Sequence, residues 1–146
     1  PHYNGANQVC GHISKLGGPT PHFPYSLDYS ASAQEVPDRQ WCCVAFTYDG
    51  SDIRSYLDGR FEARAPEKIA HTAGFLPDKP EGLVHSKNPY HYPDGIGDNG
   101  SDFTVGAVRL KNGMGNFFRG DIGGLAVFDR ALTDEELLRL ADSGKK

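Results

Sequence analysis

The sequence contains no apolar run that approaches the roughly 20 residues of a membrane-spanning helix, which argues against membrane insertion. It also lacks an excess of basic residues, because 15 Lys and Arg stand against 19 Asp and Glu for a formal charge of -4. A mildly acidic chain lacks the field that attracts phosphate backbones, so we expect no nucleic-acid partner. Gly and Pro, by contrast, account for 18 and 10 of the 146 residues. This composition predicts many turns and excludes long helices.

The cysteines show no metal-binding or redox pattern. There are three of them, at positions 10, 42 and 43, and no two are separated by the two residues of a C-x-x-C motif. A disulfide between the neighbours Cys42 and Cys43 would be strained, and in a strand their side chains point to opposite faces. We therefore expect all three to serve as small buried hydrophobic residues.

The clearest pattern is the strand signal in residues 41–48. Apolar or aromatic side chains occupy both alternating sets of positions there. This pattern is typical of a strand that is covered on both faces, in the middle of a two-layer sandwich. Trp41 is the expected core anchor of this strand.

Two Asp-Gly pairs divide the region that follows. The pair at residues 49–50 predicts a turn into a second strand at 53–57. The pair at 58–59 predicts a hairpin, because a type I′ turn needs a positive φ at both central residues. With a return strand at 61–65, the region is expected to form a three-stranded antiparallel meander.

The end of the chain predicts one short helix. Thr133 and Glu136 have the spacing of a capping box, in which each side chain bonds the other's backbone N–H. Leu132 can pack on Leu137 across this cap, and Gly144 can close the C-terminal end. The expected helix is about three turns long.

Shorter strands are expected at residues 9–15, 23–30, 103–110 and 117–128, the last with a bulge at its Gly-Gly pair. Antiparallel strands, Gly- and Pro-rich turns and one terminal helix together predict an all-β fold. We expect an antiparallel jelly-roll sandwich with one short C-terminal helix, forming a single domain over residues 1–146.

Residues 66–101 break the pattern, because they form a long stretch with neither a strand nor a helix period. Loops of this length are uncommon in compact domains and are often functional. Its far end carries four hard oxygen donors in a Gly-rich context: Asp94, Asp98, Asn99 and Asp102. These residues could bind calcium, although their spacing is not that of an EF-hand. The alternative is that their side chains cap their own backbone in turns.

The same stretch contains the aromatic run Tyr90, His91 and Tyr92. Flat amphipathic rings can stack on a sugar, so this run is the candidate ligand-binding site. In an extended chain Tyr90 and Tyr92 would point together and His91 would point the opposite way. The alternative is that both tyrosines anchor the long stretch to the sandwich.

Catalytic signals are weak. The predicted strands carry no pair of carboxylates at glycosidase spacing, and no Gly-x-Ser-x-Gly motif occurs. The six histidines are scattered without zinc-ligand spacing, and no spacing assembles them with Tyr90 into a lyase site. We therefore expect this chain to be non-catalytic by itself.

Four segments carry a family resemblance: PDRQW at residues 37–41, VAFTYDG at 44–50, YLDG at 56–59 and GDIGGLAVFDRALTDEE at 120–136. Together they resemble a bacterial-type laminin-G-like domain of the concanavalin A-like lectin/glucanase superfamily, over roughly residues 9–142. The resemblance implies a jelly roll, a secreted or cell-surface location and calcium near the sandwich rim. Unpaired cysteines would also suit the cytoplasm.

In this family, further strands usually precede the region that matches residues 12–15. Their apparent absence suggests that a second polypeptide completes the sandwich, or that the sequence is truncated. Two functions follow. The chain is a non-catalytic recognition module that binds glycan or protein, with calcium as a possible cofactor. Alternatively, it is a structural part of a larger carbohydrate-active or other hydrolase or lyase, whose active site lies mostly on another chain or domain.

Overall fold

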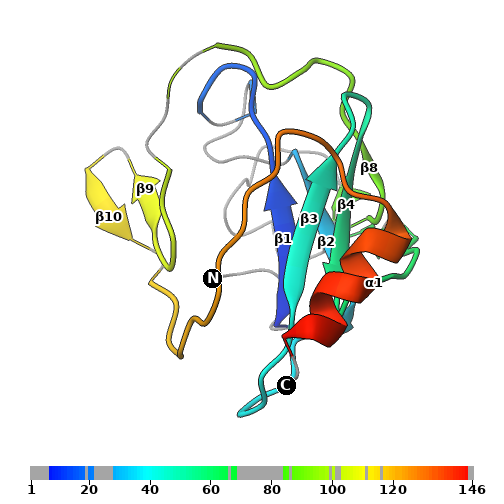
Figure 1. Ribbon diagram of the computed structural model, residues 1–146. Helices are drawn as coiled ribbons and strands as arrows, with labels where there is room; N and C mark the ends of the chain where they lie inside the picture. The colour runs from blue at the N-terminus through cyan, green and yellow to red at the C-terminus, as the bar shows by residue number, and fades with distance from the viewer. Residues whose placement is uncertain are drawn as a thin grey trace.

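Strands dominate the computed structural model, with one short helix near the C-terminus (Figure 1). The structure describes residues 7–18, 20–21, 28–65, 67–68, 84–85, 87–98, 100, 103–110, 112–115 and 117–144. The strands are β1 (Gln8–His12), β2 (Tyr29–Glu35), β3 (Val44–Tyr48), β4 (Asp52–Leu57), β5 (Arg60–Phe61), β6 (Glu67–Lys68), β7 (Val84–His85), β8 (Tyr90–His91), β9 (Val108–Leu110) and β10 (Gly113–Gly115), and the helix is α1 (Asp134–Ser143). All their pairings are antiparallel, so the all-β expectation is confirmed.

The predicted meander is present as the sheet β3-β4-β5. β3 pairs with β4 along its whole length, from Val44 opposite Leu57 to Tyr48 opposite Ile53. The hairpin between β4 and β5 has the expected backbone, with φ values of 49° at Asp58 and 73° at Gly59. β8 is the fourth strand of this sheet and pairs with the edge of β4 that also pairs with β5.

A second sheet, β1–β2, packs against β3 and β4. Gly11 and Ser30 are paired across β1 and β2, and Phe46 and Ser55 are paired across β3 and β4. The two pairs meet, because a Cβ at Gly11 would lie 2.7 Å from the Phe46 Cβ, and the Ser30 and Ser55 hydroxyl oxygens are 2.6 Å apart. Small residues therefore allow the two sheets to approach closely.

Asn88 closes a gap along β4 between the places where β5 and β8 pair. Its backbone N–H and C=O bond Arg64 at 3.1 and 2.8 Å. Its side chain accepts a hydrogen bond from the Ser55 N–H at 3.0 Å and donates to the carbonyls of Ser55 and Glu62 at 2.9 Å each. This buried amide thus supplies partners to β4 that a regular strand would supply.

The apolar core consists of two clusters. Ile13, Ile53 and Tyr92 form one cluster beneath the β4–β8 pairing. Tyr56, Leu132 and Leu137 form the other, which holds α1 against the meander. The predicted packing of Leu132 with Leu137 is confirmed.

Helix α1 begins with the predicted capping box. The Thr133 side chain accepts a hydrogen bond from the Glu136 N–H at 3.3 Å, and the Glu136 carboxylate accepts one from the Thr133 N–H at 2.9 Å. Arg130 forms two further bonds with the Glu136 carboxylate, at 2.6 and 2.8 Å. Gly144 is the C-cap, and its N–H donates to the Leu140 carbonyl.

Trp41 is not the core anchor that the sequence predicts. β3 begins only at Val44, and Trp41 is 72% exposed. Its ring lies outside the sheet beside Gly123, where an added Cβ would be 3.2 Å away. The face of β3 that carries Val44 and Phe46 is also about half exposed, at 54% and 51%. The expectation of a strand covered on both faces is therefore wrong.

The predicted strand at residues 117–128 is not formed. No strand pairs with it among the described residues, and its backbone is interrupted at Gly124, whose φ is +67°. Its large apolar side chains are 48–71% exposed. The strand at 103–110 shortens to Val108–Leu110, and that at 23–30 is replaced by β2, with residues 22–27 outside the described part.

None of the three cysteines forms a disulfide, and each is only partly buried. Burial raises the pKa of the Cys10 thiol to about 11, which keeps it protonated at neutral pH. The expectation that all three are buried is not met, because each remains partly exposed.

Candidate functional site

The aromatic run predicted from the sequence lies on β8, beside β4. Tyr90 is opposite Ile53 and is partly buried. Its hydroxyl donates to Asp28 Oδ1 at 2.9 Å, and the Lys87 Nζ lies 4.7 Å from the centre of its ring. Burial, with the neighbouring Asp28 carboxylate, raises the pKa of the Tyr90 phenol well above its usual value.

Tyr92 is buried in the first core cluster and packs with Ile13 and Ile53. Its hydroxyl accepts a hydrogen bond from the Lys15 N–H at 2.9 Å, and its carbonyl accepts one from the Tyr48 hydroxyl at 2.8 Å. These contacts are those expected of an anchor for the long stretch. They leave little of the Tyr92 ring face for a ligand.

His91 is the exposed member of the run. Its Nδ1 lies 3.1 Å from Asp52 Oδ1 and 3.4 Å from the Ser51 Oγ. Because the serine and the aspartate approach the same ring nitrogen, the three groups cannot form a relay in which histidine links a nucleophile to a carboxylate. Arg54 lies 3.4 Å from Asp49 and 4.0 Å from Asp52, which makes this edge a surface ion-pair network.

The proposed calcium ligands are only partly described. Asp94 and Asp98 are exposed, while Asn99 and Asp102 lie outside the described residues. Within the described part of the chain, no three His, Cys, Asp or Glu side chains come close enough to hold a metal ion. The loop itself is anchored, because the Gly95 N–H donates to the Tyr48 hydroxyl at 3.2 Å. Calcium binding stays a prediction.

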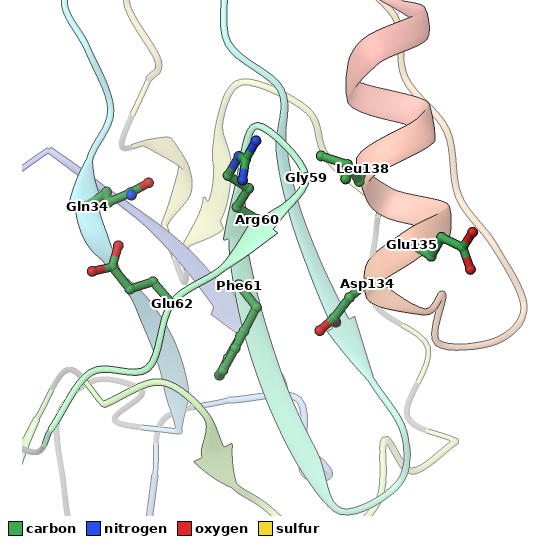
Figure 2. Close-up of a pocket in the computed structure, with 8 residues that line it drawn as sticks. All are labelled: Gln34, Gly59, Arg60, Phe61, Glu62, Asp134, Glu135 and Leu138. Atoms are coloured by element: carbon green, nitrogen blue, oxygen red, sulfur yellow. The ribbon is translucent and has the colours of Figure 1, made fainter.

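A different hollow lies between β5 and the N-terminal half of α1 (Figure 2). It is an open pocket of about 480 Å³. Its lining comes from three separate parts of the chain: Gln34, Gly59, Arg60, Phe61, Glu62, Asp134, Glu135 and Leu138. The sequence did not predict this site.

Close packing of the helix on the hairpin positions the pocket. A Cβ at Gly59 would lie 2.6 Å from the Leu137 carbonyl oxygen, so only glycine permits this approach. Phe61, one of the lining residues, packs its ring against Tyr56 in the second core cluster, with ring centres 5.8 Å apart. The Tyr56 hydroxyl in turn donates to Asp134 Oδ1 at 2.9 Å and fixes that carboxylate.

The polar groups around the pocket differ in how they are engaged. The side chains of Gln34, Arg60 and Glu62 form no hydrogen bond or ion pair with other described residues. In Figure 2 the Glu62 carboxylate lies near Gln34, Asp134 points toward the strands and Glu135 points away. The pocket therefore offers hydrogen-bond donors and acceptors on both sides of the Phe61 ring.

No sequence signal marks this pocket. The Asp-Gly hairpin and the capping box, found for their role in folding, each place part of the lining. The hairpin and the helix meet through long-range packing, which neither motif reveals. Arg60 and Glu62 are ordinary charged residues in the sequence.

The ten-residue α1 is far shorter than a bilayer-spanning helix, and the described part of the chain contains no candidate for one. No protein-family model matches the chain, and no curated protein matches it. One solved structure with some likeness is that of an S-layer domain-containing protein from Clostridium thermocellum, with 20% identity and a TM-score of 0.38. The match covers 77% of this chain and 44% of that one, so the chain spans less than half of its length. A TM-score this low assigns neither fold nor function.

Proposed function

We propose that the chain is a non-catalytic module that recognises carbohydrate in the pocket between β5 and α1. The observation that carries this proposal is the combination of the Phe61 ring with Gln34, Arg60 and Glu62, whose side chains have no partner among the described residues. Sugar hydroxyls both donate and accept hydrogen bonds, and an amide, a guanidinium and a carboxylate together meet both needs. An aromatic ring provides the apolar surface on which the C–H face of a sugar rests.

The wider assignment rests on the sequence resemblance. We propose a laminin-G-like jelly roll that is secreted or held at the cell surface. Calcium, bound by Asp94, Asp98, Asn99 and Asp102, would order the loop that follows β8. The exposed imidazole of His91 could add to binding at that edge, whereas Tyr90 and Tyr92 serve as anchors.

A titration of the purified chain with a panel of soluble oligosaccharides tests carbohydrate recognition. We expect saturable binding to at least one of them, which Arg60→Ala or Glu62→Ala weakens by about 1–3 kcal/mol, the cost of losing a charged hydrogen-bonding group. The matched control is Glu35→Gln, an exposed residue of β2 outside the pocket. If no oligosaccharide binds, or if all three variants bind like the wild type, the proposal is wrong.

The second candidate function is that of a structural part of a larger assembly. Trp41, Val44 and Phe46 are exposed on or next to β3, and the large apolar side chains of residues 117–128 are exposed as well. Extended apolar surface of this kind is typical of an interface. Native mass spectrometry of material isolated from its source would reveal a stable partner polypeptide. A lone chain that remains monomeric would contradict this candidate.

A further inference from the structure

Three charged side chains dominate the pocket between β5 and α1: Arg60, Glu62 and Asp134. The fourth, Glu135, bonds Arg139 at 2.5 Å and points away from the hollow in Figure 2. Two carboxylates and one guanidinium leave one net negative charge around the site. A charged ligand would therefore meet an excess of negative charge in the pocket.

The two carboxylates approach the pocket from opposite sides. Glu62 directly follows β5 and Asp134 begins α1, with Phe61 between them in Figure 2. The Tyr56 hydroxyl fixes the Asp134 carboxylate, whereas Asn88 bonds the backbone carbonyl of Glu62 and leaves its carboxylate without a partner among the described residues. A sugar resting on Phe61 would lie between two negative groups, with a single positive group beside it.

We infer that the pocket distinguishes sugars by charge, preferring amine-bearing over neutral sugars and both over acidic sugars. This specificity rests on the proposed carbohydrate recognition. A protonated amine gains from both carboxylates, whereas a sugar carboxylate is repelled by the excess negative charge. Because the pocket is open to water, each step amounts to about a two- to fivefold change in Kd at low salt. Higher ionic strength weakens this preference for charge.

The test uses oligosaccharide series that share one ring configuration and differ in a single substituent: a glucose series, its counterpart with an amine at C2 (glucosamine), its counterpart with a carboxylate at C6 (glucuronic acid), and the equivalent galactose series. Dissociation constants are measured at about pH 6 in low and in high salt. We expect the amine form to bind tightest and the acid form weakest, with the spread shrinking as salt is added. Equal binding of all three forms would overturn the inference and leave carbohydrate recognition standing. Absence of binding in every series would overturn both.

Two variants shift the preference in opposite directions. Glu62→Gln removes one negative charge, so the ratio of acid to amine Kd should fall toward one. Arg60→Gln removes the positive charge, so the same ratio should rise. Glu35→Gln is the control and should leave it unchanged. Because the readout is a ratio, general damage to the fold does not mimic these shifts. Variants that leave the ratio at its wild-type value would contradict the inference.

Discussion

At the scale of single residues, the approach of the two main sheets depends on side chains that are small or polar. Gly11 leaves room for the Phe46 side chain, and the hydroxyls of Ser30 and Ser55 bond each other where larger apolar groups would normally fill a core. Asn88 completes this region with its buried amide. An interior built this way tolerates little added volume.

This predicts that Gly11→Ala destabilises the domain. The new methyl group would lie 2.7 Å from the Phe46 Cβ, so β1 or β3 must shift. We expect a loss of about 1–3 kcal/mol in unfolding free energy, typical of overpacking, measured by urea denaturation. The control is Gly18→Ala, because nothing lies within 4 Å of a Cβ there. Equal stability of the two variants would show that β1 does not pack on Phe46.

At the scale of the element, α1 is held to the chain before it by a network around its N-terminus. The capping box of Thr133 and Glu136 supplies partners for the first N–H groups of the helix, and Arg130 bonds the Glu136 carboxylate twice. The helix also forms one wall of the pocket. Its attachment therefore affects the shape of the candidate site as well as stability.

Removing the cap should loosen that wall. Thr133→Ala deletes the side-chain acceptor of the Glu136 N–H, and N-cap losses of this kind cost about 1 kcal/mol. We expect a lower urea midpoint for Thr133→Ala and a near wild-type midpoint for Thr133→Ser, which keeps the hydroxyl. If the serine variant is as unstable as the alanine variant, the hydrogen bond is not what the residue contributes.

The same network predicts a pH dependence. The hydrogen bonds from Arg130, followed by that from the Thr133 N–H, lower the pKa of Glu136 from 4.5 to about 2. Because the folded pKa lies below the unfolded one, this stabilisation is complete above pH 4.5 and is lost as the pH falls toward 2. We expect Glu136→Gln to lose less stability than the wild type between pH 5 and pH 3, measured as the shift in urea midpoint. Parallel pH profiles would contradict the assigned cause.

The elements also show where sequence reasoning succeeds. The hairpin at Asp58-Gly59 and the cap at Thr133 were predicted because their signals are local and their backbone requirements are strict. Residues 117–128 have an equally clear strand pattern but form no strand, because a strand also needs a neighbour to pair with. The prediction that Trp41 is a core anchor is wrong for a related reason, because the burial of Trp41 depends on a covering layer.

At the scale of the whole molecule, the site depends on distant segments and was not predictable from sequence. β2, β5 and α1 all contribute to the pocket, and no local pattern shows that they meet. The run from Tyr90 to Tyr92 is a candidate site by sequence, and in the structure its tyrosines make the contacts of the alternative, anchors for the long stretch. Aromatic residues look alike in a sequence whether they bind a ligand or fill a core.

If the chain binds calcium, chelation should destabilise the whole domain. A ligand present at about 100 times its Kd stabilises the folded state by about 2.7 kcal/mol, so the melting temperature should fall on addition of EDTA and recover with calcium. Asp98→Asn should abolish this response. Asp142→Asn, an exposed residue of α1, should leave it intact. A melting temperature that does not change on addition of EDTA would contradict the calcium prediction.

Carbohydrate recognition in the pocket between β5 and α1 is best tested by an NMR titration of the labelled chain with a neutral oligosaccharide that it binds. We expect saturable shift changes at the amides of Gly59 to Glu62 and of Asp134 to Leu138, on the two walls of the pocket. We expect much smaller shift changes around His91. Shifts confined to the β8 edge, with the pocket amides unmoved, would contradict the pocket as the binding site.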